Sequence, residues 1–322
     1  MKNAIIPIDW NTIEDSIDLE IWNRLTTNFW LPEKIPLSND LRSWGELTPE
    51  EKLATRKVFA GLTLLDTLQG TVGAVSIIPD SRTQHEEAVL TNISFMESVH
   101  ARSYSSIFST LCSTEEIDEI FRWAKTDPTL QSKAQIIKEC YDIQERTTEA
   151  AAYRKAASVM LESFMFYSGF YLPFKMASQG RLTNTADIIR LILRDEGVHG
   201  YYLGYKFQQH RNELTEEQRN RLDYWVDTKV RHLYALESQF SEDLYDPIGW
   251  TENVKTYLRY NANKTMQNLG YDSIFSDSET RVEAAIMSSM TVDANETHDF
   301  FSGSGSSYVM AEVEETTDDD WD

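Results

Sequence analysis

Two segments of the chain repeat one short pattern, a glutamate followed three residues later by a histidine. The first pair is Glu97 and His100, and the second is Glu196 and His199. Both pairs lie in long stretches with helical periodicity, where residues three apart project from one face of the helix. One such pair often arises by chance, but two pairs on separate long helices constrain the fold strongly. They favour a helical bundle in which two helices each bring a carboxylate and an imidazole to one place.

Helical patterns cover most of the chain, and strand patterns are nearly absent. Thr48, Pro49 and Glu51 form a capping pattern that predicts a helix running to about Ile77, before Pro79. One stripe of this helix carries Leu62, Leu65, Asp66 and Gln69. Other helices are predicted near 13–27, 82–111, 128–137, 150–178 with a kink at Pro173, 183–205 and 250–268, with further helix starts at Ser113 and Thr215.

The predicted fold is all-α, a helical bundle with extra helices and a flexible C-terminal tail. We assign residues 1–270 to the bundle and residues 271–322 to the tail. The tail contains the glycine- and serine-rich stretch 303–307, and from Glu312 onward it is acidic with no basic residue. Such a segment has too few apolar groups to fold alone.

The charge balance restricts the classes of partner. The chain has 52 acidic and 30 basic residues and a formal net charge of −22, which repels the phosphate backbone of nucleic acids. Cys112 and Cys140 lack the spacing of a disulfide framework or a zinc site. The sequence shows neither a signal peptide nor a run of eighteen apolar residues. We therefore expect a soluble cytoplasmic protein with no direct nucleic-acid or membrane contact.

Two further acids complete a chemically specific set. Asp66 and Glu162 each lie on a predicted helix that precedes a Glu-x-x-His helix in chain order. One carboxylate from each of two helices, with Glu-x-x-His from two others, is the pattern of carboxylate-bridged dimetal sites. Oxygen-rich ligation with one imidazole per metal suits iron or manganese. The ions would also make the burial of four acids tolerable.

Each of these residues alone has a simpler interpretation. An isolated Asp66 or Glu162 is more often a solvated or salt-bridged acid. Only together with the two Glu-x-x-His pairs do these acids favour a metal site. Tyr104, one turn beyond His100, is by itself an ordinary core tyrosine, but an oxidising dimetal centre could remove an electron and a proton from it. Three apolar residues could shield it from water: Phe166, Phe170 and Ile192. The histidines without this spacing are predicted to be surface or structural residues: His85, His210, His232 and His298.

With these residues in place, the chain resembles the small (beta, radical-generating) subunit of class Ib ribonucleotide reductase. The similarity extends over almost the whole chain and is carried by specific strings at residues 22–26, 28–34, 61–67 and 298–308. It implies a ferritin-like helical bundle that houses two manganese ions, or two iron ions, and a tyrosyl radical on Tyr104. The implied metal ligands are Asp66, Glu97, His100, Glu162, Glu196 and His199.

The resemblance also implies a radical path and partners. Trp30 and Asp195 match residues that link the metal site, through His100, to the subunit surface, and Tyr308 matches a mobile tyrosine between subunits. The acidic tail resembles the peptide that docks the large (alpha) subunit, which reduces ribonucleoside diphosphates for DNA synthesis with a thioredoxin- or glutaredoxin-like reductant. A homodimer is expected. A flavodoxin-like protein is expected to supply superoxide to the manganese form, whereas oxygen activates the iron form directly.

Two other functions remain open at this level. A dimetal oxygenase that hydroxylates or desaturates a bound substrate would use the same ligands but would leave Tyr104 and the tail without a role. An iron-storage or helical binding protein would also fit an all-α fold. Turnover of a substrate by this chain alone would favour the first alternative, and many irons per chain without a radical would favour the second.

Overall fold

A computed structural model of the chain describes residues 6–290, and within them every regular element is a helix. The prediction of an all-α fold is therefore confirmed. In chain order the elements are α1 (Ser16–Thr27), η1 (Pro32–Lys34), η2 (Leu37–Asp40), α2 (Leu41–Glu46), α3 (Pro49–Leu68), η3 (Gln69–Gly73), α4 (Ala74–Ile77), η4 (Ile78–Asp80), α5 (Gln84–Leu111), α6 (Thr114–Thr126), α7 (Pro128–Tyr141), α8 (Thr148–Met160), η5 (Leu161–Met165), α9 (Tyr167–Ala177), α10 (Thr183–Glu213), α11 (Glu216–Tyr245), η6 (Asp246–Ile248), α12 (Thr251–Asn268) and α13 (Ala284–Met290).

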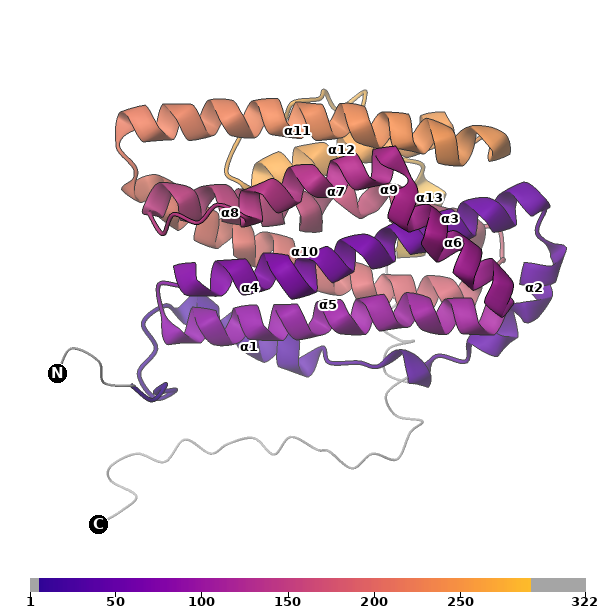
Figure 1. Cartoon of the computed structure of the whole chain (residues 1–322), viewed down its shortest axis with the longest axis horizontal. Coiled ribbons are helices and arrows are strands. Elements are labelled where there is room, and N and C mark those ends of the chain that lie inside the picture. Colours follow the sequence, from indigo (N-terminus) through magenta and orange to yellow (C-terminus); the bar gives the residue numbers. More distant parts are fainter. Residues whose placement is uncertain (1–5, 291–322) are drawn as a thin grey trace, which may run out of the picture. The chain divides into compact units, whose positions relative to one another are not determined.

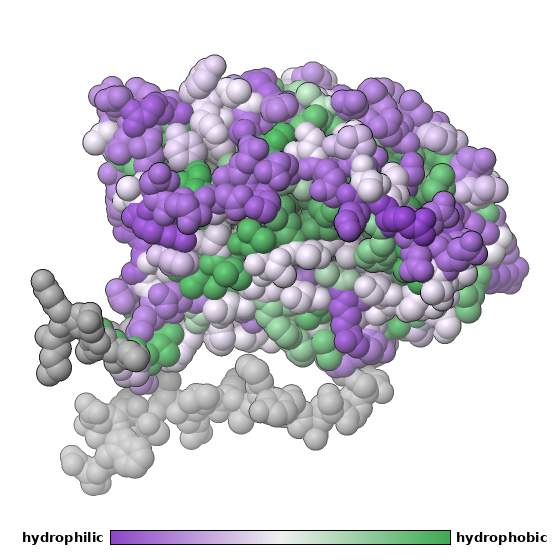
Figure 2. Space-filling view, in the orientation of Figure 1, coloured by the Kyte–Doolittle hydropathy of each residue, from purple (hydrophilic) through white to green (hydrophobic). Residues whose placement is uncertain are grey.

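The long helices lie side by side as a bundle (Figure 1). Helix α10 packs against α8 and α9, α3 packs against α5, and α12 joins α11 to the bundle. Their contact faces form one continuous apolar core, while hydrophilic side chains cover much of the outer face seen in Figure 2. This amphipathic division holds the long helices at fixed mutual positions.

Local sequence fixes where most helices begin. The predicted starts at Thr48, Ser113 and Thr215 are confirmed as capping boxes, in which side chain and backbone hydrogen-bond reciprocally. Helix α10 differs because Leu182, before its first turn, is left-handed with φ +48° and provides no side-chain cap. Asp40 supplies the cap instead, since its carboxylate accepts a hydrogen bond of 2.6 Å from the backbone N–H of Thr185.

Two of the helices predicted as continuous contain a π-helical turn. The turn η3 (Gln69–Gly73) separates α3 from α4, and η5 (Leu161–Met165) separates α8 from α9. Each π turn adds a residue to the helical repeat and so redirects the side chains that follow. The expected single helices over 49–77 and 150–178 are therefore corrected, and Pro173 lies inside α9. Both turns lie beside the candidate site described below.

Part of the segment assigned to the tail has structure of its own. Helix α13 packs against α9, its Ile286 is fully buried, and Arg190 Nε donates to the Ser289 carbonyl at 2.6 Å. The proposed domain boundary at residue 270 stays a prediction. Residues 291–322, which carry the acidic stretch, lie outside the described part of the chain.

One helical stretch, Pro49–Asp80, is long and apolar enough to cross a membrane by composition alone. In this structure 67% of its most apolar window is buried inside the protein. It is a core helix of the bundle, and its apolar length is explained by packing against α5 and α9.

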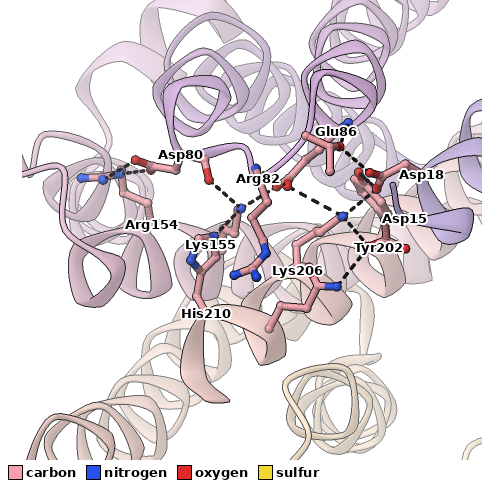
Figure 3. Close-up of polar contacts among 12 residues, drawn as sticks. Asp15, Asp18, Asp80, Arg82, Glu86, Arg154, Lys155, Tyr202, Lys206 and His210 are labelled. Carbon is pink, nitrogen blue, oxygen red and sulfur yellow. Dashed lines mark hydrogen bonds and ion pairs between the residues drawn. The ribbon is translucent and has the colours of Figure 1, made fainter. Parts of the chain in front are cut away.

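A buried ionic network joins four helices of the bundle (Figure 3). Lys206 of α10 lies 2.6 Å from the carboxylate of Asp18 in α1, and Lys155 of α8 lies 2.5 Å from that of Glu86 in α5. Lys155 Nζ is also 2.9 Å from His210 Nε2, and burial together with this ammonium group lowers the pKa of His210 to about 3. His210 thus accepts a hydrogen bond as a neutral ring, which is a structural role, one of the two alternatives (surface or structural) predicted for it.

Glu86→Gln should destabilise the protein strongly, because it leaves the Lys155 ammonium buried without its carboxylate. Breaking one partner of a buried ion pair costs about 3–5 kcal/mol. The free energy of unfolding, measured by denaturant titration at one protein concentration, should fall by that amount. Glu87→Gln, an exposed neighbour on the same helix, should change it by no more than about 0.5 kcal/mol. Equal losses for the two variants would contradict this account of the network.

Candidate metal centre

The structure brings the six predicted ligands together in the interior of the bundle. They come from four segments: α3 supplies one, α5 two, η5 one and α10 two. Their ligand atoms form two groups, each with all atoms within 4.8 Å of one another, and every member is buried. One group is Asp66, Glu97, His100 and Glu196, and the other is Glu97, Glu162, Glu196 and His199.

Glu97 and Glu196 belong to both groups. Glu196 Oε1 lies 3.0 Å from His100 Nδ1, and its Oε2 lies 3.5 Å from His199 Nδ1. Glu97 also lies between the two imidazoles. Its Oε1 is 3.0 Å from His199 Nδ1, and its Oε2 is 3.7 Å from His100 Nδ1. Each of these carboxylates presents one oxygen to each imidazole, which is the geometry of a bridge between two cations. The spacing in the sequence identified the two residues but not this sharing.

The donor set fits two cations. Both carboxylate oxygens of Asp66, Glu97 and Glu196 are buried without a hydrogen-bond partner among the described residues. Buried polar atoms are seldom left unsatisfied, and an unpaired buried carboxylate is costly. Oxygen ligands with one imidazole per group match the preference of manganese and iron. The arrangement is therefore able to bind two metal ions.

The pKa values of four residues in the cluster are raised, which favours their protonated forms. Burial, followed by the neighbouring carboxylate of Glu97, raises the pKa of Asp66 and of Glu162 well above the usual range. Burial alone would lower the pKa of His100 and His199, but the surrounding carboxylates raise it well above the ordinary value. Without ions the cluster therefore retains protons, and metal binding releases them.

The outer nitrogen of His100 is held by Asp195. Asp195 Oδ2 lies 3.2 Å from His100 Nε2 and accepts a hydrogen bond of 2.7 Å from Trp30 Nε1. The rings of Trp30 and His100 are also stacked, with centroids 6.0 Å apart. This contact directs His100 Nδ1 toward the cluster, as a carboxylate bonded to the outer nitrogen of a metal-binding histidine commonly does. The predicted residues Trp30 and Asp195 thus form a connected chain with His100, while Tyr308 lies outside the described residues.

Tyr104 is completely buried beside the cluster. The Asp66 carboxylate lies next to its hydroxyl, although no hydrogen bond of normal geometry to the phenol oxygen is formed within residues 6–290. Burial, then the carboxylates of Asp66, Glu196 and Glu97, raise the pKa of Tyr104 well above its ordinary value. The ring of Phe59 stacks against it with centroids 5.7 Å apart. Phe166, Phe170 and Ile192 are fully buried, and their shielding of Tyr104 stays a prediction.

Two polar neighbours of the cluster were not predicted as site residues. Gln69 donates a hydrogen bond to Glu162, and Tyr141 donates one of 2.7 Å to Gln69. Gln69 was visible on the stripe of Asp66, but nothing in the sequence connected it with Glu162. Of the histidines predicted to lie outside the site, His85 is buried against the Asp9 carbonyl and His232 is exposed, while His298 lies outside the described residues.

The fold and the cluster together place the chain in one class of proteins, the helical bundles with a buried site of carboxylates and histidines that is suited to two metal ions. Comparisons with known proteins identify the family within this class. Residues 7–282 match the family described as ribonucleotide reductase, small chain. Ribonucleoside-diphosphate reductase subunit beta of Mycobacterium leprae is 58% identical over 320 residues, 99% of this chain and 97% of that protein. Ribonucleoside-diphosphate reductase 2 subunit beta of Escherichia coli is 54% identical over 319 residues, 99% of this chain and 98% of that protein.

Solved structures agree with the sequence comparison. The dimanganese(II)-NrdF of Streptococcus sanguinis superposes with a TM-score of 0.85 and 52% identity, covering 89% of this chain and all of that one. The chain belongs to the ribonucleotide reductase small chain family. This confirms the predicted ferritin-like fold and the role of radical-generating subunit of an oxidoreductase.

Glu97 and Glu196 belong to both groups of ligand atoms, whereas Asp66 belongs to one. Substitution of a shared residue should therefore weaken the binding of both metal ions, and substitution of an unshared residue the binding of one. Wild-type protein should bind two Mn²⁺ per chain, measured by the electron paramagnetic resonance (EPR) signal of free Mn²⁺ during titration. Asp66→Ala should remove one of the two, whereas Glu196→Ala should weaken both by about 100-fold or more, beyond the loss typical of an outer-shell partner. Glu115→Ala, an exposed acid of α6, should leave both intact. A Glu196→Ala variant that lost only one ion would contradict the shared geometry.

Proposed function

We propose that the six clustered residues hold two manganese ions, or two iron ions, and that the centre oxidises Tyr104 to a stable radical. The radical is then passed to a large subunit that reduces ribonucleoside diphosphates to deoxyribonucleoside diphosphates. The observation that carries this proposal is the burial of Tyr104 beside Asp66, at the edge of a cluster suited to two metals. The dimanganese(II) form of the related NrdF supports the choice of metal.

The protein's own residues prepare Tyr104 for a coupled loss of electron and proton. When bound and activated by an oxygen-derived oxidant, the metal pair supplies the one-electron oxidant. The raised pKa of Tyr104 keeps the phenol neutral, so the proton must leave together with the electron. The Asp66 carboxylate is the group placed to receive that proton. Burial then keeps water and reductants away from the oxidised ring.

A run of contacts supports a path out of the site. His100, Asp195 and Trp30 form a hydrogen-bonded chain that leads from the cluster to the segment before η1, where Phe29 and Leu31, on either side of Trp30, are exposed. We propose that the electron and its accompanying proton travel along this chain, and that Tyr308 continues the path to the large subunit.

The proposed assembly has three protein contacts. The chain forms a homodimer and works with the large subunit, which its C-terminal tail, within 271–322, docks. A flavodoxin-like protein supplies superoxide for the manganese form. The names of the relatives as beta subunits support a multi-subunit enzyme. We place the protein in the cytoplasm, without a membrane or direct nucleic-acid partner.

The alternatives considered from the sequence account for fewer observations. A dimetal oxygenase or an iron-storage protein would require neither a buried phenol beside Asp66 nor the connected chain from His100 to Trp30. The family match also favours the reductase subunit over both.

Tyr104→Phe should abolish the tyrosyl signal in EPR spectra of protein loaded with iron and oxygen, or with manganese and the flavoprotein. Two metal ions per chain should still bind, because the phenol is not a ligand. Tyr171→Phe is a matched control, since Tyr171 is also a buried phenol but packs against Tyr245 and Tyr257. It should retain the signal. A tyrosyl signal that persisted in Tyr104→Phe would place the radical elsewhere.

Removal of residues 309–322 tests the docking role of the tail. The truncated chain should form the Tyr104 radical normally but lose ribonucleotide reduction with the large subunit. An acidic segment with a single aromatic residue, Trp321, suits a peptide that docks through one aromatic anchor. Turnover equal to that of the full chain would show that the large subunit binds without the tail.

A further inference from the structure

Three buried polar residues adjoin Glu162 but do not belong to the ligand set. Gln69 comes from η3, Tyr141 from the end of α7, and Ser158 from α8. All three are buried. Because polar groups are placed in a bundle core only at a cost unless they are paired, a linked group next to a metal site calls for an explanation.

The hydrogen bonds fix the orientation of the Gln69 amide. Its Nε2 donates to Glu162 Oε1 and, at 3.2 Å, to Ser158 Oγ. Its Oε1 accepts from Tyr141 Oη at 2.7 Å, and Tyr141 Oη lies 2.9 Å from Ser158 Oγ. With a metal ion bound, Glu162 is an ionised carboxylate that only accepts hydrogen bonds, so the NH₂ end of the amide has to face it. The phenol of Tyr141 then satisfies the other end.

The two oxygens of Glu162 are consequently not equivalent. Oε1 is occupied by the Gln69 amide, whereas Oε2 has no hydrogen-bond partner in the described part of the chain and lies 3.5 Å from His199 Nδ1. We propose that Gln69 is a positioning residue, which holds Glu162 so that Oε2 alone is presented to the metal beside His199. This inference rests on the proposed dimetal site and adds to it a residue that controls one half.

Two glycines near Gln69 leave the space that this contact needs. A Cβ at Gly73 would lie 2.2 Å from Gln69 Oε1 and 2.8 Å from the Tyr141 ring, so only glycine leaves room for the amide and the phenol. A Cβ at Gly70 would lie 2.9 Å from Glu97 Cβ, which shows how closely the π turn approaches α5. Ser94 Oγ donates to the Gly70 carbonyl at 2.7 Å and thereby fastens the turn to that helix.

Different residues therefore orient the two halves of the site. The half with His100 is oriented through Asp195 and Trp30, whereas the half with Glu162 and His199 is oriented through Gln69 and Tyr141. Loss of the Gln69 amide should affect only the second half. A general loss of stability would weaken both halves together, so selectivity between them distinguishes positioning from a merely structural role.

The test measures Mn²⁺ affinity of each half separately. In an Asp66→Ala background, only the half with His199 remains, and Gln69→Met should weaken its Mn²⁺ affinity by about 10- to 100-fold, as expected for loss of an outer-shell partner. In a His199→Ala background, the same substitution should change the affinity of the remaining half less than about 3-fold, well below the loss expected for an outer-shell partner. Free Mn²⁺ is followed by EPR, and folding is checked by circular dichroism.

Gln209→Met is the matched control, because Gln209 also donates its amide to a carboxylate, that of Asp15, at 3.0 Å. It should leave both affinities unchanged. If Gln69→Met fails to fold, Tyr141→Phe replaces it and should weaken the same half. Equal effects on both halves, or none on the half with His199, would overturn the role of Gln69. If the unsubstituted protein binds fewer than two Mn²⁺, the proposed dimetal site itself is wrong.

Discussion

Mutual repulsion among four buried carboxylates is the constraint on which the rest of this structure depends. Asp66, Glu97, Glu162 and Glu196 lie within one small volume that water does not reach, where each unpaired charge would cost several kcal/mol. The packed helices hold these groups together, and either retained protons or bound cations relieve the repulsion between them. The sharing of Glu97 and Glu196 between both imidazoles means that the two metal positions form one unit, which is the property a two-ion oxidant needs.

Two residues of the cluster are hydrogen-bonded from behind by different kinds of group, His100 by a charged carboxylate and Glu162 by a neutral amide. Asp195 places a carboxylate behind His100 and connects it to Trp30, so this contact both orients the imidazole and links the cluster to the segment before η1. Gln69 places a neutral amide behind Glu162 and leads only to buried groups. On one side the cluster is thus connected to Trp30, whose neighbours Phe29 and Leu31 are exposed, and on the other side it is connected only to buried residues.

The sequence was sufficient for the features that follow from helical periodicity. The spacing of Glu97 with His100 and of Glu196 with His199 places each pair on one face of a helix in any packing, and the capping box at Thr48 is a local property. The π turns at 69–73 and 161–165 depend on tertiary contacts, such as that of Gly70 with Glu97, so periodicity predicted uninterrupted helices there. The partner of Gln69 and the position of Glu196 between His100 and His199 also depend on tertiary contacts, so helical periodicity did not predict them.

The central claim is that Glu97 and Glu196 hold two metal ions between them, one beside His100 and one beside His199. Anomalous X-ray scattering from crystals of the manganese-loaded protein tests it most directly. The account predicts two manganese peaks about 3.5–4 Å apart, the usual separation in two-metal sites, each next to one of the two histidines. A single peak, or two peaks too far apart to share Glu97 and Glu196, would contradict it.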